Sequence, residues 1–207
     1  RLFVHKIIDQ KNPKLGIRRV MPVDPMNIRK VRSYPKPARD GTYDVNKIES
    51  EINKLTDWET HRIFDVPNLS KLIPNFSRIF CDVERFSDDK LEPMSKLGRG
   101  FYYTKTDSSE YLREDNIEHK NRILNDYYLP HHNRLDEMVD EKLSLYGTCT
   151  IIDCHSFSDE PFNTDLDKSK NRPDVCIGID SFHTPKHLVD QFTNYFKNIG
   201  YDVKINS

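Results

Sequence analysis

The chain has 207 residues, a formal net charge of -1 and four cysteines, which is enough sequence for one hydrophobic core or two small ones. Hydrophobic residues make up 36% of it and aromatic residues 11%, which excludes a wholly disordered chain. The near-neutral charge gives no general reason to expect a nucleic-acid partner. No apolar run approaches the length of a membrane span, so we expect no membrane partner. The cysteines form no Cys-x-x-Cys pair, and we expect reduced thiols in a cytoplasmic protein.

The beginning of the chain differs from the rest in charge. Residues 1–45 carry 11 Lys and Arg against 4 Asp and Glu, and they hold 5 of the 12 prolines. The run 2–8 has the composition of a strand, whereas the prolines that follow disfavour a long helix or a central strand. We therefore predict that residues 1–43 form a basic, proline-rich segment that is separate from an α/β domain over 44–207. Within this segment, 9–43 would be an irregular arm or linker. Such an arm is usually just solvated; the alternative is that it contacts an acidic partner, RNA or DNA.

From residue 44 onward, helical and strand-like patterns alternate. Ile48, Ile52 and Leu55 are spaced i, i+4 and i+7, which predicts an amphipathic helix. Runs typical of strands lie at 76–83, 148–153, 174–179 and 201–205. Further helices are expected from near Ser109, from Pro130 to Gly147, and from Thr184-Pro185, with Pro130 separating the first two. Strands that alternate with helices predict a largely parallel sheet.

Polar residues gather where the strand expected at 148–153 ends. Asp153 and His155 are two residues apart, so on an extended backbone they point to the same side. In open α/β sheets, ligands bind beyond the carboxyl ends of the strands. A carboxylate beside an imidazole there is either a metal-ligand pair or an acid–base pair. The alternative is a capped strand end with a hydrogen-bonded surface histidine.

Two other charged clusters precede it. Asp57 and His61 are four residues apart, one turn along a helix face, and taken alone they are more simply an exposed ion pair. Glu84 and Arg85 follow the expected strand at 76–83 and form a charged cluster at its end.

From about residue 47 onward, the chain resembles the N-formylglutamate amidohydrolase family. The matching pieces are LTDWETHRIF (55–64), FSRIFCDVERF (76–86), YLPHH (128–132), IIDCHSF (151–157) and DVCIGID (174–180). The resemblance implies a three-layer α/β/α fold with a mostly parallel central sheet, like that of zinc carboxypeptidases. It also implies Zn²⁺ or another divalent metal, and hydrolysis of the amide bond of a small N-acyl amino acid such as N-formyl-glutamate.

The resemblance also implies metal ligands. His155 is the first candidate ligand, His61 or Asp57 the second, and His5 a third. Asp153 would orient the His155 ring through a hydrogen bond. A hydrolytic zinc site typically has three nitrogen or oxygen ligands and one open position, which this set would provide.

Other residues would bind substrate or transfer protons. Arg85, or else Arg78, offers a planar guanidinium that matches a substrate carboxylate. Glu84 is a candidate general base, the alternative being a structural ion pair with Arg85. His132 would be a transition-state donor or a proton carrier. Asp180, at another strand end, is expected to face the same crevice.

The sequence departs from the family at three places. A Pro-His-Ser motif, whose His resembles a metal ligand, has only Val4-His5-Lys6 as its counterpart, and His61 stands where many members have an acidic residue. Relatives also continue past a segment like 201–207, so we expect a fragment or a member with a replaced front end. Two alternatives to an amidohydrolase therefore stay open: a catalytically inactive relative that acts as a binding module, and a carboxypeptidase-like peptidase.

Overall fold

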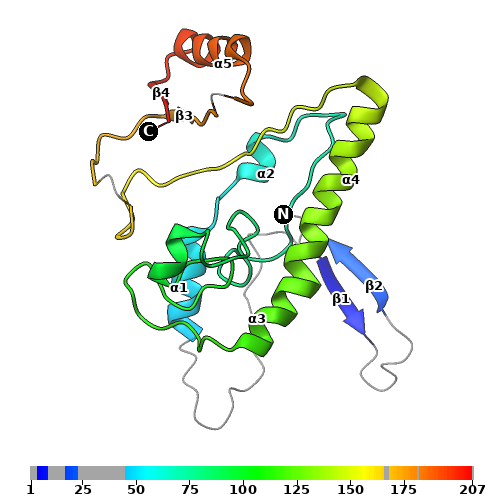
Figure 1. Ribbon diagram of the computed structural model, residues 1–207, viewed down its shortest axis with the longest axis vertical. Helices are drawn as coiled ribbons and strands as arrows, with labels where there is room; N and C mark the ends of the chain where they lie inside the picture. Colours follow the sequence, from blue (N-terminus) through cyan, green and yellow to red (C-terminus); the bar gives the residue numbers. More distant parts are fainter. Residues whose placement is uncertain (1–3, 9–16, 23–44, 166–167, 181, 207) are drawn as a thin grey trace.

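The computed structural model describes residues 4–8, 17–22, 45–165, 168–180 and 182–206, and it is an α/β structure with a small parallel sheet (Figure 1). Its elements in chain order are β1 (Val4–Ile8), β2 (Ile17–Pro22), α1 (Val45–Leu55), α2 (Thr60–Ile63), η3 (Pro93–Leu97), α3 (Ile117–Ile123), η4 (Leu124–Tyr128), α4 (Leu129–Tyr146), β3 (Val175–Ile177), α5 (Lys186–Asn198) and β4 (Val203–Ile205). Within this set, η3 is a 3₁₀ helix and η4 is a turn of π-helix.

Strands β1 and β2 form an antiparallel hairpin in which Val4 pairs with Pro22 and Ile7 with Arg19. This confirms the strand expected near the start of the chain. The prediction of an irregular 9–43 was wrong for 17–22. Residues 17–21 contain no proline, so their amide groups are available to a ladder, and Pro22 stands at the strand end where a missing N–H is tolerated. The remaining parts of the predicted arm lie outside the described residues.

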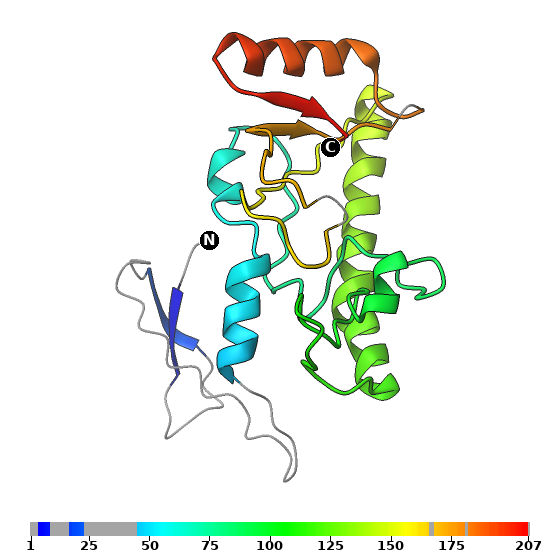
Figure 2. The same ribbon diagram turned by 90° about the vertical axis from the view of Figure 1, so that its left-hand side faces the viewer.

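Strands β3 and β4 are parallel neighbours, with Val175 opposite Val203 and Ile177 opposite Ile205. Helix α5 connects them, which is the crossover that parallel strands require. Both strands lie where the sequence predicted them, and this β3–α5–β4 unit occupies one end of the molecule in both views (Figures 1 and 2). Gly200, with a φ of 98°, makes the left-handed turn that ends α5.

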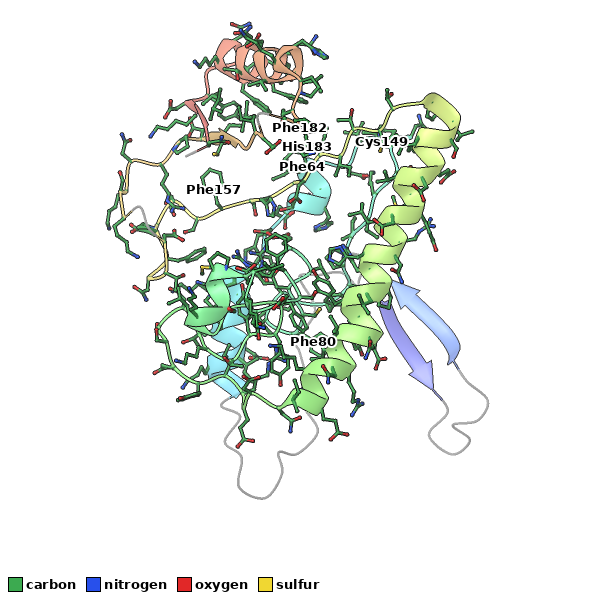
Figure 3. All side chains as sticks on the ribbon, in the orientation of Figure 1. Phe64, Phe80, Cys149, Phe157, Phe182 and His183 are labelled. Carbon is green, nitrogen blue, oxygen red and sulfur yellow. The ribbon has the colours of Figure 1, made fainter. Side chains whose placement is uncertain are left out.

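The strand predicted at 76–83 was wrong, because this segment forms consecutive turns. The amide groups of Phe80 and Cys81 both donate to the carbonyl of Ser77, at 2.9 and 3.1 Å. Phe76 and Phe80 pack their rings edge-on against the same partner, Tyr127, at 5.6 and 4.8 Å. Figure 3 shows Phe80 beside the long helix. Apolar residues four apart that face one partner fit a turn of helix better than the two-residue period of a strand.

The buried strand predicted at 148–153 was also wrong. The segment is extended but lies outside every ladder of the described residues, and Ile151 and Ile152 are 61% and 59% exposed. It passes beside α2 in both views (Figures 1 and 2). A β-branched sequence favours extended backbone, but a ladder also needs a neighbouring strand, and the described part of the chain places none there.

Helices α3 and α4 are joined by η4 into one continuous helical run, so the predicted break at Pro130 was wrong. Pro130 stands at the second residue of α4, directly after the π turn. A proline inside an α-helix lacks one amide donor and clashes with the carbonyl four residues earlier. The wider π turn relaxes that crowding, which lets the run continue to Tyr146. Gly147, with a φ of 70°, ends it as predicted.

The hydrophobic core lies between α1, the 98–113 segment and the first turns of the long helical run. One cluster contains Cys81, Phe101, Tyr102, Ile123 and Tyr128, and a second contains Leu55, Ile79, Tyr103 and Leu112. None of the helices in the described part of the chain combines the length and apolar character that crossing a membrane would require.

Candidate metal site

Three side chains from distant parts of the chain converge at the surface. Asp57 lies between α1 and α2, Glu84 lies in the turn at 82–85, and His155 lies in the extended segment after α4. Each offers one ligand atom, and the three atoms lie within 4.8 Å of one another. Nδ1 of His155 is 3.5 Å from Oδ2 of Asp57 and 3.8 Å from Oε1 of Glu84. This group is the candidate metal site.

The linker after α1 fixes the position of Asp57. The Thr56 hydroxyl donates to the carbonyl of Ile52 at 2.6 Å, and the Trp58 indole donates to the carbonyl of Asn53 at 2.8 Å. The Thr60 hydroxyl in turn donates to the backbone carbonyl of Asp57 at 3.0 Å. These bonds hold both sides of the linker, so Asp57 has a defined backbone from which its carboxylate reaches the site.

The turn at 82–85 fixes Glu84. Asp82 is 1% exposed, and its Oδ1 accepts the amide hydrogen of Glu84 at 3.2 Å. Its second oxygen accepts the hydroxyl of Tyr103 at 2.9 Å, and Tyr103 is fully buried. A buried carboxylate needs such partners because an unsatisfied one is costly. The turn is therefore anchored in the core, while the Glu84 side chain points to the partly exposed site.

The His155 ring is held on both sides. Its Nε2 lies 3.0 Å from Oδ2 of Asp153, so the same-side pair predicted from the sequence is present. The hydroxyl of the next residue, Ser156, donates to the carbonyl of Trp58 at 2.9 Å and ties this segment to the linker that carries Asp57. With Asp153 on Nε2, the Nδ1 atom is directed at the other two members of the site, as in a carboxylate–histidine–metal arrangement.

The charges in the site are balanced by Arg78. Its Nη2 donates to Oδ2 of Asp57 at 2.7 Å and to Oε2 of Glu84 at 3.2 Å. Hydrogen bonds to Asp153 and then Asp57 raise the pKa of His155 to about 10, so the imidazole carries a proton at neutral pH. Partial burial raises the pKa of Glu84, and Arg78 opposes that rise. Two cations thus neutralise most of the charge of three carboxylates.

His61, predicted as the alternative to Asp57 for the second ligand, lies in α2 and is not a member of the ligand group found among the described residues. A ligand role for His61 stays a prediction. His5 lies in β1, and its side chain is outside the described part of the structure. Sequence reasoning had treated Glu84 only as a base or an ion-pair partner. A ligand role for Glu84 was missed because its proximity to Asp57 depends on the packing of segments 27 residues apart.

Arg85 lies beside the site on the same turn as Glu84. Its guanidinium is 3.7 Å from the carboxylates of both Asp82 and Glu92, which is longer than a hydrogen bond. Its Nε is buried and has no hydrogen-bond partner among the described residues. The Arg85 side chain is 31% exposed, so part of this cation is open to an anion from solvent, whereas its Nε is not. The role of Arg85 in substrate binding stays a prediction.

The other two predicted site residues make different contacts. Nε2 of His132 is 2.9 Å from the carbonyl of Val83, so the ring faces the backbone of the turn. Asp180 accepts hydrogen bonds from the amides of Phe182 and His183 and from the His183 ring at 2.8 to 3.0 Å. Its described contacts are thus local, and none of them joins the ligand group.

A hollow of about 460 Å³ elsewhere in the molecule does not belong to this site. It is lined by Leu97, Asp107, Ser108, Ser109, Asn163, Thr164 and Asp165, and shares no residue with the ligand group. Asp107 is a structural anchor: its carboxylate binds Lys54 of α1 and accepts from the amide groups of Asn163 and Thr164 at 2.9 and 3.0 Å. These bonds satisfy its buried charge, so Asp107 is already engaged by structural partners.

Two carboxylates and an imidazole match the ligands of hydrolytic zinc sites in number and kind. The α/β fold and this group of possible metal ligands are compatible with a hydrolase. The comparison with known families agrees: a model of N-formylglutamate amidohydrolase matches residues 31–207, and the chain belongs to that family. The family points to hydrolysis of amides. No curated protein and no solved structure matches the chain.

Proposed function

We propose that the chain hydrolyses the amide bond of an N-acyl amino acid such as N-formyl-glutamate, in a reaction that depends on a divalent metal, zinc in the first instance. The observation that carries the proposal is the convergence of Asp57, Glu84 and His155 in a member of an amide-hydrolase family. The catalytic domain would comprise 44–207 and follow the three-layer plan of zinc carboxypeptidases.

Asp57, Glu84 and His155 would hold the metal. When bound, it would polarise the amide carbonyl and lower the pKa of the attacking water. His155 must give up its proton to become a ligand, and Asp153 would keep the ring oriented through Nε2. Arg78 must then release at least one of the two carboxylates that it binds.

Glu84 has two roles that substitution can separate. As a ligand it would use Oε1, which faces His155. As a general base it would take a proton from the attacking water, and its pKa, raised by partial burial, suits that task. Glu84→Gln would lose zinc affinity if Glu84 is a ligand, but would lose only turnover if it is the base.

Arg85 would bind the substrate carboxylate. The partial exposure of its side chain and its position next to Glu84 support this role. Arg78 supports the same function less directly, because its guanidinium is already engaged by Asp57 and Glu84. We place Arg85 in the substrate subsite and Arg78 among the ligand carboxylates.

The test is release of formate from N-formyl-L-glutamate by the purified chain, with added Zn²⁺ and with a chelator. We expect turnover with the metal and none with the chelator. N-acetyl amino acids and dipeptides in the same assay separate a deformylase from a carboxypeptidase-like peptidase. Absence of turnover on every amide despite bound zinc would contradict the proposal.

A binding module without catalysis is the second candidate. The observation that favours it is the charge balance of the site, in which Arg78 and protonated His155 already neutralise the carboxylates. Such a site is stable without a metal. Zinc content of the purified chain distinguishes the two functions, because a non-catalytic module of this kind would bind none.

A further inference from the structure

Two side chains of the long helical run hold the turn that carries Glu84 and Arg85. The hydroxyl of Tyr128 donates to the carbonyl of Arg85 at 2.8 Å. Nε2 of His132 lies 2.9 Å from the carbonyl of Val83, and because a carbonyl only accepts, Nε2 must carry the proton. The two carbonyls stand on either side of Glu84 in the chain, so these bonds fix the backbone around both functional side chains.

The two donors form one unit. Tyr128 and His132 are four residues apart and therefore lie on one helix face, with ring centroids 4.3 Å apart. Tyr128 is 8% exposed, and its ring also meets Phe101 edge-on at 5.4 Å. Tyr128 closes the π turn and His132 follows Pro130, so the continuous run through Pro130 is what brings both donors to the turn.

The opposite side of the turn is held by the core. Asp82 is bonded to the buried Tyr103 hydroxyl, and the amide of Asp82 donates to the carbonyl of Phe101 at 2.8 Å. In contrast, the side chains of Glu84 and Arg85 are 39% and 31% exposed. A rigid backbone that presents partly exposed polar groups is the arrangement that a preorganised binding site needs.

We propose that Tyr128 and His132 are positioning residues of the site: His132 sets the place of Glu84 for metal binding, and Tyr128 sets the place of Arg85 for the substrate carboxylate. The inference rests on the proposed function. It differs from the sequence-based expectation for His132, since it gives the ring a backbone partner in place of a transition-state role.

The experiment uses the full chain and four variants. Tyr128→Phe removes only the hydroxyl, and His132→Leu removes the donor. His132→Gln restores an N–H donor on a side chain of similar reach. His131→Leu is the matched control, because His131 is adjacent and partly buried but makes no described hydrogen bond to the turn. The readouts are Zn²⁺ affinity by calorimetry, the Michaelis constant for N-formyl-glutamate, and the ¹³C shifts of the Val83 and Arg85 carbonyls in the metal-free chain.

We expect His132→Leu to weaken Zn²⁺ binding about tenfold or more, the effect typical of residues that orient a ligand, with a shifted Val83 carbonyl. His132→Gln should recover most of that affinity. Tyr128→Phe should shift the Arg85 carbonyl and raise the Michaelis constant about fivefold or more, the loss of roughly one hydrogen bond, while Zn²⁺ affinity and the turnover number stay near wild type. His131→Leu should leave all readouts unchanged.

Two results would overturn the inference. In one, the ¹³C shifts of the carbonyls do not change in the variants, which would show that the hydrogen bonds do not form. In the other, the shifts change but Zn²⁺ affinity and the Michaelis constant stay at wild-type values, which would show that the two residues do not position the site. Failure of the proposed function looks different, because the wild-type chain would then bind neither Zn²⁺ nor substrate. The hydrogen bonds would still be judged by the carbonyl shifts, and the positioning role would fall with the function.

Discussion

The Nη2 atom of Arg78 lies 2.7 Å from Oδ2 of Asp57, so a cation already occupies one carboxylate of the candidate metal site. A metal cation bound there would repel the positively charged guanidinium of Arg78. A divalent metal at this site must therefore displace the guanidinium. We predict that Arg78→Met, which keeps much of the side-chain volume but removes the charge, strengthens Zn²⁺ binding about tenfold, as measured by calorimetry.

The matched control for that variant is Arg62→Met. Arg62 pairs with Glu59 on the surface and has no described contact with the ligand group, but the substitution changes the net charge equally. Its Zn²⁺ affinity should equal that of the wild type. Weaker binding by Arg78→Met would show that the guanidinium organises the carboxylates for the metal and does not compete with it.

The raised pKa of His155 predicts a pH dependence of stability in the metal-free chain. The folded pKa of about 10 lies above the ordinary value of 6.5, so the protonated ring stabilises the fold. That contribution is fully present below pH 6.5 and is lost as the pH rises toward 10. In urea unfolding with a chelator, the difference in unfolding free energy between wild type and His155→Gln should shrink over that window. A difference independent of pH would contradict the assignment.

Asp107 should be a strong determinant of stability. It is 1% exposed, binds Lys54 and Arg99, and accepts from Thr164. Burial alone would raise its pKa, but the hydrogen bonds from Lys54 and the loop amides outweigh burial and lower it. We predict that Asp107→Asn costs about 2–4 kcal/mol at neutral pH, because the buried guanidinium of Arg99 would keep its charge but lose the carboxylate that pairs with it.

The stability loss of Asp107→Asn should also depend on pH, in a direction that can be checked. A depressed carboxyl pKa contributes stability above the ordinary value of 3.8, and that contribution fades as the pH falls below it. The Asp107→Asn deficit should therefore shrink in acid. Asp65→Asn is the control, since Asp65 makes an exposed ion pair with Lys71 and its substitution should leave stability close to that of the wild type.

Arg85 should determine the recognition of the substrate carboxylate. A lysine keeps the charge but cannot present two parallel N–H groups. We expect Arg85→Lys to weaken binding of N-formyl-glutamate by about 1–3 kcal/mol, the scale of a charged hydrogen bond. Arg134→Lys, on the exposed face of α4, should bind like the wild type. An unchanged Michaelis constant and turnover number in Arg85→Lys would show that Arg85 does not recognise the substrate carboxylate.

Local patterns predicted the parts of the structure that depend on local contacts. The spacing of Ile48, Ile52 and Leu55 predicted α1, and the two-residue spacing of Asp153 and His155 predicted their contact. Whether a predicted strand forms depends on whether another strand lies beside it. The run 174–179 finds β4 beside it, whereas 148–153 has a similar composition but no adjacent strand in the described part of the chain.

The candidate site itself was only partly predictable. The family resemblance placed His155 and either His61 or Asp57 among the ligands, and the structure groups His155 with Asp57 and adds Glu84. The position of Glu84 depends on the turn at 82–85, which Tyr103 and His132 hold from two sides. Contacts over such sequence distances leave no periodic pattern, so spacing alone could not reveal them.

The most direct test of the account is the zinc content of the purified chain and of His155→Ala, measured by elemental analysis beside a thermal unfolding curve. We predict about one Zn²⁺ per wild-type chain and none in the variant. The fold should persist, since the His155 side chain is 39% exposed and lies outside both core clusters. Equal zinc in both proteins would show that His155 is not a ligand, and a zinc-free wild type would contradict the metal-dependent function.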